Sequence, residues 1–359
     1  MPHPAATRAT VSVIVPARNE EASLGACLES LLRLQGVAFE IIVVDDGSID
    51  LTREIAGSFS AVKVVGAAHL PPGWSGKTNA MLSGARESQG EWLLFTDADT
   101  VHLPGSLARA LQEAKQHGAA LLSYSPEQEV HGFWQKAVMP VIFAELAASY
   151  RPSQVSSPAF PVAAANGQYL LISREAYEAV GGHAAVAGSL LEDVALARAV
   201  KASGRRIFFR FGGDAVRTRM YRSFAELREG WTKNLALLFP SAGRLATMRL
   251  LEFVLITGSV GELVNALLHR RSKVAFISGV LAAVLIGAFA KRIRKAHFPR
   301  DSNMLALLGL PLFSSLLLRS RALHKKGNII WKGRRYTGSA TPIMPQSPSL
   351  LDGTTSWST

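Results

Sequence analysis

The chain has 359 residues, of which 48% are apolar and only 18% charged, and its mean hydropathy of +0.18 is high for a purely soluble protein. Part of the chain is therefore expected to meet lipid. The net charge of +12 fits either nucleic acid or an anionic membrane surface, and the single cysteine excludes an intramolecular disulfide.

The first ten residues contain no apolar run, so a cleaved secretory signal is not expected. Strands are predicted at 11–16, 40–44, 61–66 and 92–95, and helices at 20–34, 50–58 and 77–88. Cys27 follows the apolar spacing of the first helix and is expected to be packed. Continuous apolar strands alternating with helices predict an α/β fold, with a mostly parallel sheet covered by helices on both faces.

Three long apolar segments follow, at 250–268, 274–290 and 303–318, and they approach the ~17–25 residues that span a bilayer. Basic runs beside them favour membrane helices over buried soluble ones. Gly309-Leu310-Pro311 is expected to break the third segment into a re-entrant hairpin. Glu252, Glu262 and Asn265 leave open that the first segment only lies in the interface. A shorter segment, 133–150, is expected to lie along the interface or to form a lid.

Acidic pairs end two of the predicted strands, at the sheet edge where ligands bind in such folds. Asp97 and Asp99 could share a divalent cation with diphosphate oxygens, and Asp45 or Asp46 could accept hydrogen bonds from a base or ribose. A plain turn explains either pair as well, because Asp is common in turns.

Lys77 lies in Gly73–Thr78, which looks like a P-loop but has Pro71 where that motif needs its first glycine. At a helix start Lys77 could face phosphates, or it could be a plain surface lysine. Glu192 and Asp193 open a predicted helix, either as simple capping acids or with Asp193 as a general base. Residues 220–234 offer further groups that could bind an acceptor or diphosphate, or anchor the chain at an interface: Arg222, Arg228, Trp231 and Lys233.

Taken in order, VSVIVPARNEE, EIIVVDDGSID, FTDADT and the pair Glu192-Asp193 resemble family 2 glycosyltransferases over about residues 11–235. Further segments resemble the membrane-bound members associated with carotenoid and hopanoid pathways. These segments are GWSGKTNA, GQYLLISREAYEAVGGH, LLEDVALARAVKASG, MYRSFAELREGWTKN and WKGRRY.

The resemblance implies a nucleotide-binding fold of the A type, a Mg²⁺ or Mn²⁺ ion and inversion at the anomeric carbon. It implies that a single sugar, with UDP-glucose as the expected donor, passes to a hydroxyl or carboxyl group of a membrane lipid or isoprenoid. The implied nucleotide-sugar residues are Pro16, Arg18, Glu20, one of Asp45 and Asp46, Lys77 and Asp97. Asp97 and Asp99 would hold the metal, Asp193 would be the base beside Glu192, and Gln168, Arg222, Arg228 and Trp231 would contact the acceptor or diphosphate.

One departure bears on the product. Processive polysaccharide synthases of this family carry Gln-x-x-Arg-Trp, whereas residues 227–231 read LREGW. This favours single transfer over a processive synthase, and the presence of Asp99 and Asp193 argues against a non-catalytic scaffold. Nucleic acid is not expected, because the basic residues gather beside the apolar segments, five at 291–300 and seven at 319–335.

The expected organisation has five parts: an extension at 1–10, a catalytic domain at 11–240, membrane-embedded or interfacial helices at 250–318, a basic membrane-proximal segment at 319–336 and a disordered tail at 337–359. The catalytic domain is expected to face the cytoplasm at the inner membrane, since basic segments resist translocation.

Overall fold

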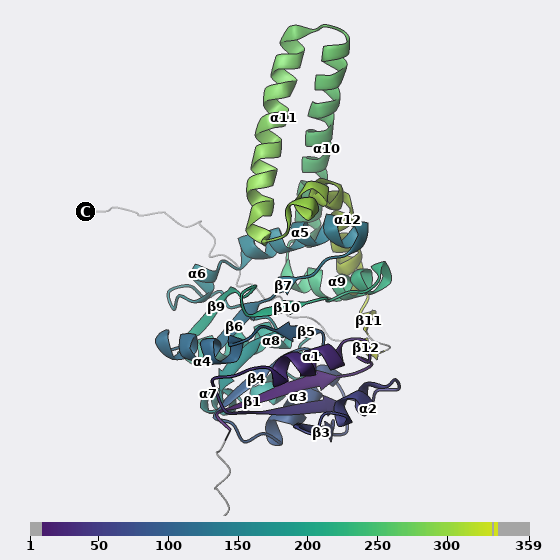
Figure 1. The fold of residues 1–359 in the computed structure, drawn as a ribbon. Coiled ribbons are helices and arrows are strands. Elements are labelled where there is room, and N and C mark those ends of the chain that lie inside the picture. The colour runs from purple at the N-terminus through teal and green to yellow at the C-terminus, as the bar shows by residue number, and fades with distance from the viewer. Residues whose placement is uncertain (1–8, 332–333, 337–359) are drawn as a thin grey trace, which may run out of the picture.

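The computed structural model describes residues 9–331 and 334–336. The predicted tail at 337–359 and most of the predicted extension lie outside the described residues. At the centre is a seven-stranded sheet in the order β3-β2-β1-β4-β8-β6-β9, in which only β8 runs antiparallel to its neighbours (Figure 1). The strands are β1 (Val11–Ala17), β2 (Phe39–Asp45), β3 (Val62–Gly66), β4 (Trp92–Phe95), β6 (Leu121–Ser125), β8 (Leu170–Ser173) and β9 (Ile207–Phe211).

Helices cover both faces of this sheet because successive strand residues point to opposite sides. Val13 belongs to the core under one set of helices and Ile14 to the core under the other. The first set is α1 (Leu24–Leu32), α2 (Thr52–Gly57) and α4 (Ser106–Gln116). The second set is α3 (Gly76–Arg86), α7 (Arg174–Ala179) and α8 (Glu192–Ala202). The predicted fold class is confirmed, and Cys27 is fully buried.

The predicted helix at 20–34 begins later, at Leu24. The backbone N–H groups of Glu20 and Glu21 instead donate to Thr52 and Asp50, and Asn19 has a positive φ of 52°. These contacts hold residues 18–23 as a loop over the carboxyl end of β1. Because residues 18–23 form a loop, their side chains are available to a ligand. A first helical turn at the same place would direct them differently.

A second sheet, of three very short strands, was not predicted. It has the order β5-β10-β7 and consists of β5 (Thr100–His102), β10 (Val216–Thr218) and β7 (Glu127–Gln128). Segments of two or three residues carry no periodicity that could identify them as strands.

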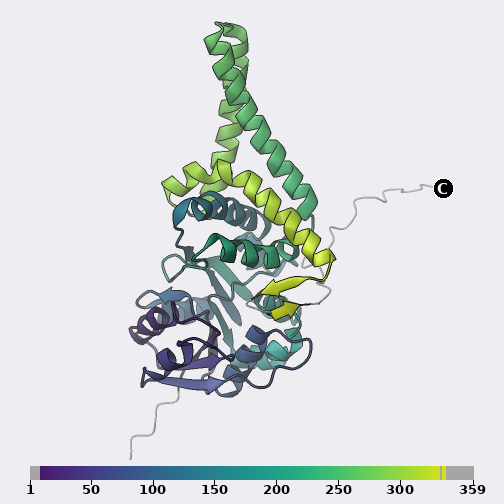
Figure 2. The ribbon, with the colours of Figure 1, turned by 90° about the vertical axis from the view of Figure 1, so that its right-hand side faces the viewer.

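A helical unit lies above the sheet domain (Figure 2), and its helices share one hydrophobic core. It contains α5 (Gly132–Ser149), α9 (Phe224–Leu238), α10 (Ala242–Leu268), α11 (Ser272–Ile293) and α12 (Arg300–Lys325). Segment 133–150, expected along the interface or as a lid, forms a helix that is largely buried on one side. Val138, Val141 and Ile142 are fully buried, because α5 packs beneath α12.

The expected break at Gly309-Leu310-Pro311 is wrong: α12 is continuous with Pro311 inside it. A proline within a helix costs ~3 kcal/mol, so this helix needs strong tertiary support. Gly309 supplies the close approach, since a Cβ at this position would overlap the carbonyl oxygen of Ala137 in α5. Packing against α5, α9 and α10 buries Leu310, Phe313 and Leu317 and outweighs the local preference.

Helices α10 and α11 form an antiparallel hairpin that projects away from the rest of the molecule (Figure 1). Within the described residues, α10, α11 with the turn after it (to Ala296), and α12 are long and apolar enough to cross a membrane. Apolar side chains of the hairpin are largely exposed: the exposed fractions of Leu268, Phe276 and Ile277 are 76%, 73% and 67%. Such a large apolar surface is unusual for a soluble protein.

Charged residues join the base of the hairpin to α5. The Arg249 guanidinium lies 2.9 Å from Glu145 and 3.1 Å from Glu252, and that of Arg292 lies 3.3 Å and 2.7 Å from the same two carboxylates. Two arginines and two glutamates leave no net charge. Glu252, expected to be costly in hydrocarbon, is therefore neutralised by its partners. These ion pairs therefore fix three helices of the helical unit, α5, α10 and α11, to one another.

Candidate active site

The carboxyl ends of β1 and β4 open into a cavity of about 1060 Å³. It gathers twelve of the fourteen site residues that the resemblance implied. Those that line it are Pro16, Arg18, Glu20, Asp46, Lys77, Asp97, Asp99, Gln168, Glu192, Asp193 and both Arg222 and Trp231. Asp45 and Arg228 lie outside the lining.

The loop after β1 and the end of β2 build one end of the cavity. The Arg18 guanidinium donates to the carbonyl oxygen of Asp46 at 2.6 Å. Asp45 instead accepts from the backbone N–H of Ser48 and pairs with Arg53 at 3.4 Å. Of the two aspartates, Asp46 therefore faces the cavity, while Asp45 holds the turn after β2.

Asp97 and Asp99 lie in the turn after β4. Its shape is fixed by Thr100, whose hydroxyl donates to the Asp97 carbonyl oxygen at 2.7 Å, and by Thr96, whose hydroxyl donates to the Gln168 carbonyl oxygen at 2.8 Å. No group of three or more His, Cys, Asp or Glu side chains suited to a metal occurs within the described part of the chain. Two carboxylates fit Mg²⁺ or Mn²⁺, because Mg²⁺ is commonly held by one or two carboxylates together with substrate phosphates and water.

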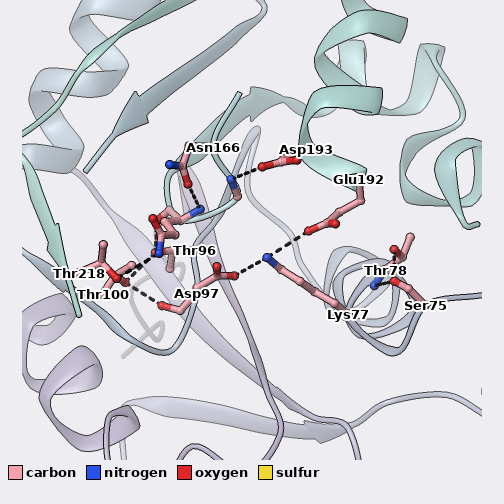
Figure 3. A network of polar contacts seen from close by, with 12 residues as sticks. Ser75, Lys77, Thr78, Thr96, Asp97, Thr100, Asn166, Glu192, Asp193 and Thr218 are labelled. Atoms are coloured by element: carbon pink, nitrogen blue, oxygen red, sulfur yellow. Dashed lines mark hydrogen bonds and ion pairs between the residues drawn. The ribbon is translucent and has the colours of Figure 1, made fainter. Parts of the chain in front are cut away.

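Lys77 connects this turn to the opposite wall (Figure 3). Its ammonium lies 2.7 Å from Asp97 and 3.0 Å from Glu192. Ser75 caps α3 by accepting from the Thr78 N–H at 3.0 Å, which places Lys77 in the first helical turn. Burial opposes the charge on Lys77, but the Asp97 and Glu192 carboxylates outweigh it and raise the pKa of Lys77 well above its ordinary value.

Asp193 stands in the first turn of α8 with both carboxylate oxygens held by backbone groups. The N–H of Gly167 donates to it at 2.8 Å and the N–H of Val194 at 2.7 Å (Figure 3). Burial, followed by the charge of Glu192, raises the pKa of Asp193 to about 6. Burial opposes ionisation of Glu192 too, but Lys77 and then Lys233 outweigh it, so the pKa of Glu192 is lowered.

Adjacent carboxyls with divergent pKa values can take different roles. Glu192 stays ionised as the partner of Lys77. Asp193 can accept and release a proton close to neutral pH, which suits a general base.

Three of the four predicted acceptor residues line the cavity, each in a different environment. Gln168 is buried and its amide donates to the Thr218 hydroxyl at 3.1 Å, and the Arg222 guanidinium donates to the Ala22 carbonyl oxygen at 2.7 Å. Trp231 is only 3% exposed and its indole N–H contacts Met139 Sδ at 3.2 Å. Arg228 is exposed and outside the cavity, so the structure gives it no contact with a ligand there.

Several cavity residues were not identified from the sequence as site residues. The Gly167 N–H is a backbone group, which no side-chain motif reveals. Tyr150, Phe209 and Phe211 belong to apolar patterns that look like ordinary core. Their place in the cavity depends on how α5 and β9 meet.

Comparisons with known proteins agree with this geometry. The family description Glycosyl transferase family 2 matches residues 12–181. A 4,4'-diaponeurosporenoate glycosyltransferase of Staphylococcus aureus is 27% identical over 340 residues, which cover 91% of this chain and 88% of that protein.

Among solved structures, the fold is similar to that of the mannosyltransferase PcManGT from Pyrobaculum calidifontis, determined in complex with GDP-Man and Mn²⁺. The TM-score is 0.51 at 17% identity, over 88% of this chain and 87% of that one. The matched residues include the ends of β1 and β4 that line the cavity, and residues 12–181 form a family 2 glycosyltransferase domain.

Proposed function

We propose that this glycosyltransferase moves a single sugar from a nucleoside diphosphate donor to a hydroxyl or carboxyl group of a membrane lipid or isoprenoid. The observation that carries the proposal is the line Asp97–Lys77–Glu192, with contacts of 2.7 Å and 3.0 Å. It joins a turn suited to a diphosphate to the helix that begins with the candidate base, within one cavity.

On the donor side, Pro16, Arg18, Glu20 and Asp46 would surround the nucleoside, and Lys77 would face the diphosphate. Asp97 and Asp99 would hold a Mg²⁺ or Mn²⁺ ion, which neutralises charge on the leaving diphosphate. Hard carboxylate oxygens suit either ion. UDP-glucose is the donor to test first, on the strength of the resemblance in sequence.

On the acceptor side, Asp193 would take the proton of an attacking hydroxyl. The acceptor oxygen forms a bond to the anomeric carbon as the bond to the diphosphate oxygen breaks, and the configuration inverts. The proton ends on the Asp193 carboxylate. A carboxylate acceptor has no proton to lose, and Asp193 would then have no role as a base.

The name of the Staphylococcus aureus relative supports an acceptor related to a carotenoid. The exposed apolar hairpin supports a membrane location, with the catalytic domain on the cytoplasmic side. Single transfer is favoured over polymer synthesis because residues 227–231 lack the Gln-x-x-Arg-Trp order.

The experiment is to incubate membranes containing the enzyme with labelled nucleotide-sugars of several kinds, and to identify the product that becomes labelled. Membranes containing Asp193→Asn protein serve as the control. We expect one lipid to gain one sugar in an enzyme-dependent way. A labelled polymer would instead support a processive synthase, and no enzyme-dependent product would refute the proposal.

A further inference from the structure

The cavity continues well beyond the residues needed for donor and base. One wall of this extension comes from α5 and the residue that directly follows it: Phe143, Leu146 and Ala147 of the helix and then Tyr150 line the cavity. Their spacing of three, four and seven residues places them on one face of the helix. At 1.5 Å per residue, the stripe from 143 to 150 is about 10 Å long.

The opposite wall comes from β9. Phe209 and Phe211 are two residues apart, so both side chains point to the same side of the strand and both line the cavity. The space between α5 and β9 is therefore bounded mainly by aromatic and aliphatic groups. We call this part of the cavity the apolar arm.

The inner end of the apolar arm lies at the candidate base. Tyr150 lies close enough to Asp193 for the two groups to interact. Burial raises the pKa of Tyr150 to about 12, and the negative charge of Asp193 adds to this rise while the positive charge of Arg198 opposes it. Asn166 and Gly167 also line this end, and the Gly167 N–H is the group that holds Asp193.

The outer end lies at the base of the hairpin. Phe211 stacks on His297 with ring centroids 4.3 Å apart and planes 11° from parallel. His297 directly follows η2 (Arg294–Ala296), which continues from the end of α11 and packs against α5. Arg294, Lys295 and His297 are exposed and line the cavity here, so this end carries cationic groups where lipid headgroups are expected.

We propose that the acceptor is a linear amphiphile that enters the apolar arm from the leaflet at the hairpin base, reactive end first. Its apolar chain lies between α5 and β9 and continues toward the bilayer, while a terminal hydroxyl or carboxyl group reaches Asp193. Because the base lies at the end of the arm remote from the hairpin, a reactive group in the middle of a chain cannot reach it. The inference rests on the proposed function and adds to it the shape of the acceptor.

Two neighbouring alanines of α5 provide a matched test. Ala147 lines the apolar arm, whereas Ala148 is exposed and does not. Ala147→Trp fills the arm, with Ala147→Leu as a milder change and Ala148→Trp as the control. One methylene in an apolar pocket changes discrimination ~10–200-fold, so kcat/KM for 1-hexadecanol and hexadecanoic acid should fall at least about tenfold in both Ala147 variants. Donor binding and slow donor hydrolysis should stay within about twofold, which verifies folding.

The wild-type enzyme is also given 8-hexadecanol, which has the same length but an internal hydroxyl. We expect transfer to 1-hexadecanol only. Equal use of both alcohols, or an unchanged kcat/KM in the Ala147 variants, would overturn the apolar arm as the acceptor site. Transfer to native lipid without transfer to any linear probe would overturn the linear class and leave the proposed function intact. No sugar transfer to any acceptor would instead refute the proposed function itself.

A second measurement does not depend on turnover. A hexadecanoic acid carrying a photoreactive diazirine in its chain is cross-linked to wild-type enzyme in membranes. Adducts on peptides that contain 143–150 and 207–211, reduced in Ala147→Trp and not in Ala148→Trp, are expected. Adducts confined to the hairpin would contradict the proposal.

Discussion

The ammonium of Lys77 lies 3.0 Å from the carboxylate of Glu192 and, at the same time, 2.7 Å from that of Asp97. One cation thus joins the turn after β4 to the first turn of α8. The two carboxylates come from distant parts of the chain, and without Lys77 they would repel each other across the cavity. The proposed donor contact at Asp97 and the ionisation of Glu192 are therefore coupled through one side chain.

Lys77→Met should lower kcat/KM by about 10²–10³, the usual loss when a charged group that stabilises a leaving group is removed. Lys63→Met is the matched control, because Lys63 makes an exposed pair with Glu87, and such pairs contribute little. Steady-state kinetics on both variants provide the measurement. If Lys77→Met keeps more than half of the wild-type kcat/KM, the lysine has no part in the reaction.

Asp193→Asn should lower turnover ~10²–10⁴-fold with a hydroxyl acceptor, because a positioned base typically contributes that much. Donor affinity should be unchanged, since Asp193 contacts backbone N–H groups rather than the donor residues. Equilibrium binding of the donor and single-turnover rates separate the two effects. More than half of the wild-type rate in the Asn variant would show that another group is the base.

The pH profile should follow the ionisation of Asp193. Its pKa is raised to about 6, and only the carboxylate can accept a proton, so kcat/KM should rise with pH and level off above about pH 7. At pH 5 it should be about a tenth of the plateau. Glu192→Gln removes the negative neighbour and should move this limb toward lower pH. A limb that stays in place in Glu192→Gln would argue against Asp193 as the titrating group.

Activity should require a divalent cation, because Asp97 and Asp99 offer carboxylate oxygens that Mg²⁺ and Mn²⁺ prefer. Excess chelator should abolish turnover, and added Mg²⁺ or Mn²⁺ should restore it. Asp99→Ala should weaken binding of the nucleoside diphosphate sugar at least about tenfold and leave binding of the nucleoside alone unchanged. Full activity in chelator would remove the metal from the proposal.

The turn at the tip of the hairpin should lie outside the cell, and the segment after α11 should lie in the cytoplasm. Single cysteines replace Arg271 and Lys295, both exposed, in a Cys27→Ser background. In intact cells a membrane-impermeant thiol reagent should label position 271, and position 295 only after lysis. Labelling at 295 without lysis would reverse the orientation, and no labelling at 271 would favour a hairpin that lies in the interface.

The sheet and the acidic residues of the site could be predicted because local sequence determines them. Asp97 directly follows an apolar strand, and Glu192 opens a helix, so both positions follow from periodicity alone. The partners of Lys77 could not be predicted, since they depend on three elements meeting across the sheet. The choice between Asp45 and Asp46 also had to come from the turn, where Ser48 and Arg53 engage Asp45, and from the cavity, which Asp46 lines.

The sequence-based expectations that differ from the structure have a common physical cause: tertiary contacts outweigh local sequence preference. Pro311 breaks a helix by local preference, yet α12 continues through it because tertiary packing on α5 is stronger. The extent to which 133–150 is buried could not be predicted either, because the neighbours that cover Val138 and Ile142 are distant in sequence. Arg228 belongs to a plausible basic motif, but the helical turn directs it away from the cavity.

The hydrophobic core shared by α5, α9, α10, α11 and α12 bears on how this enzyme can be handled and how it can evolve. A chain cut after residue 240 would lack α10, α11 and α12, which cover buried residues of α5 and α9 such as Val138 and Leu235. The exposed apolar surface should make such a fragment aggregate rather than remain a soluble catalytic domain. Proteolytic shedding from the membrane would inactivate such an enzyme. Replacing α10, α11 and α12 by other membrane helices would require redesign of α5 and α9, which line the cavity. The apolar helices and the catalytic domain should therefore be inherited as one unit.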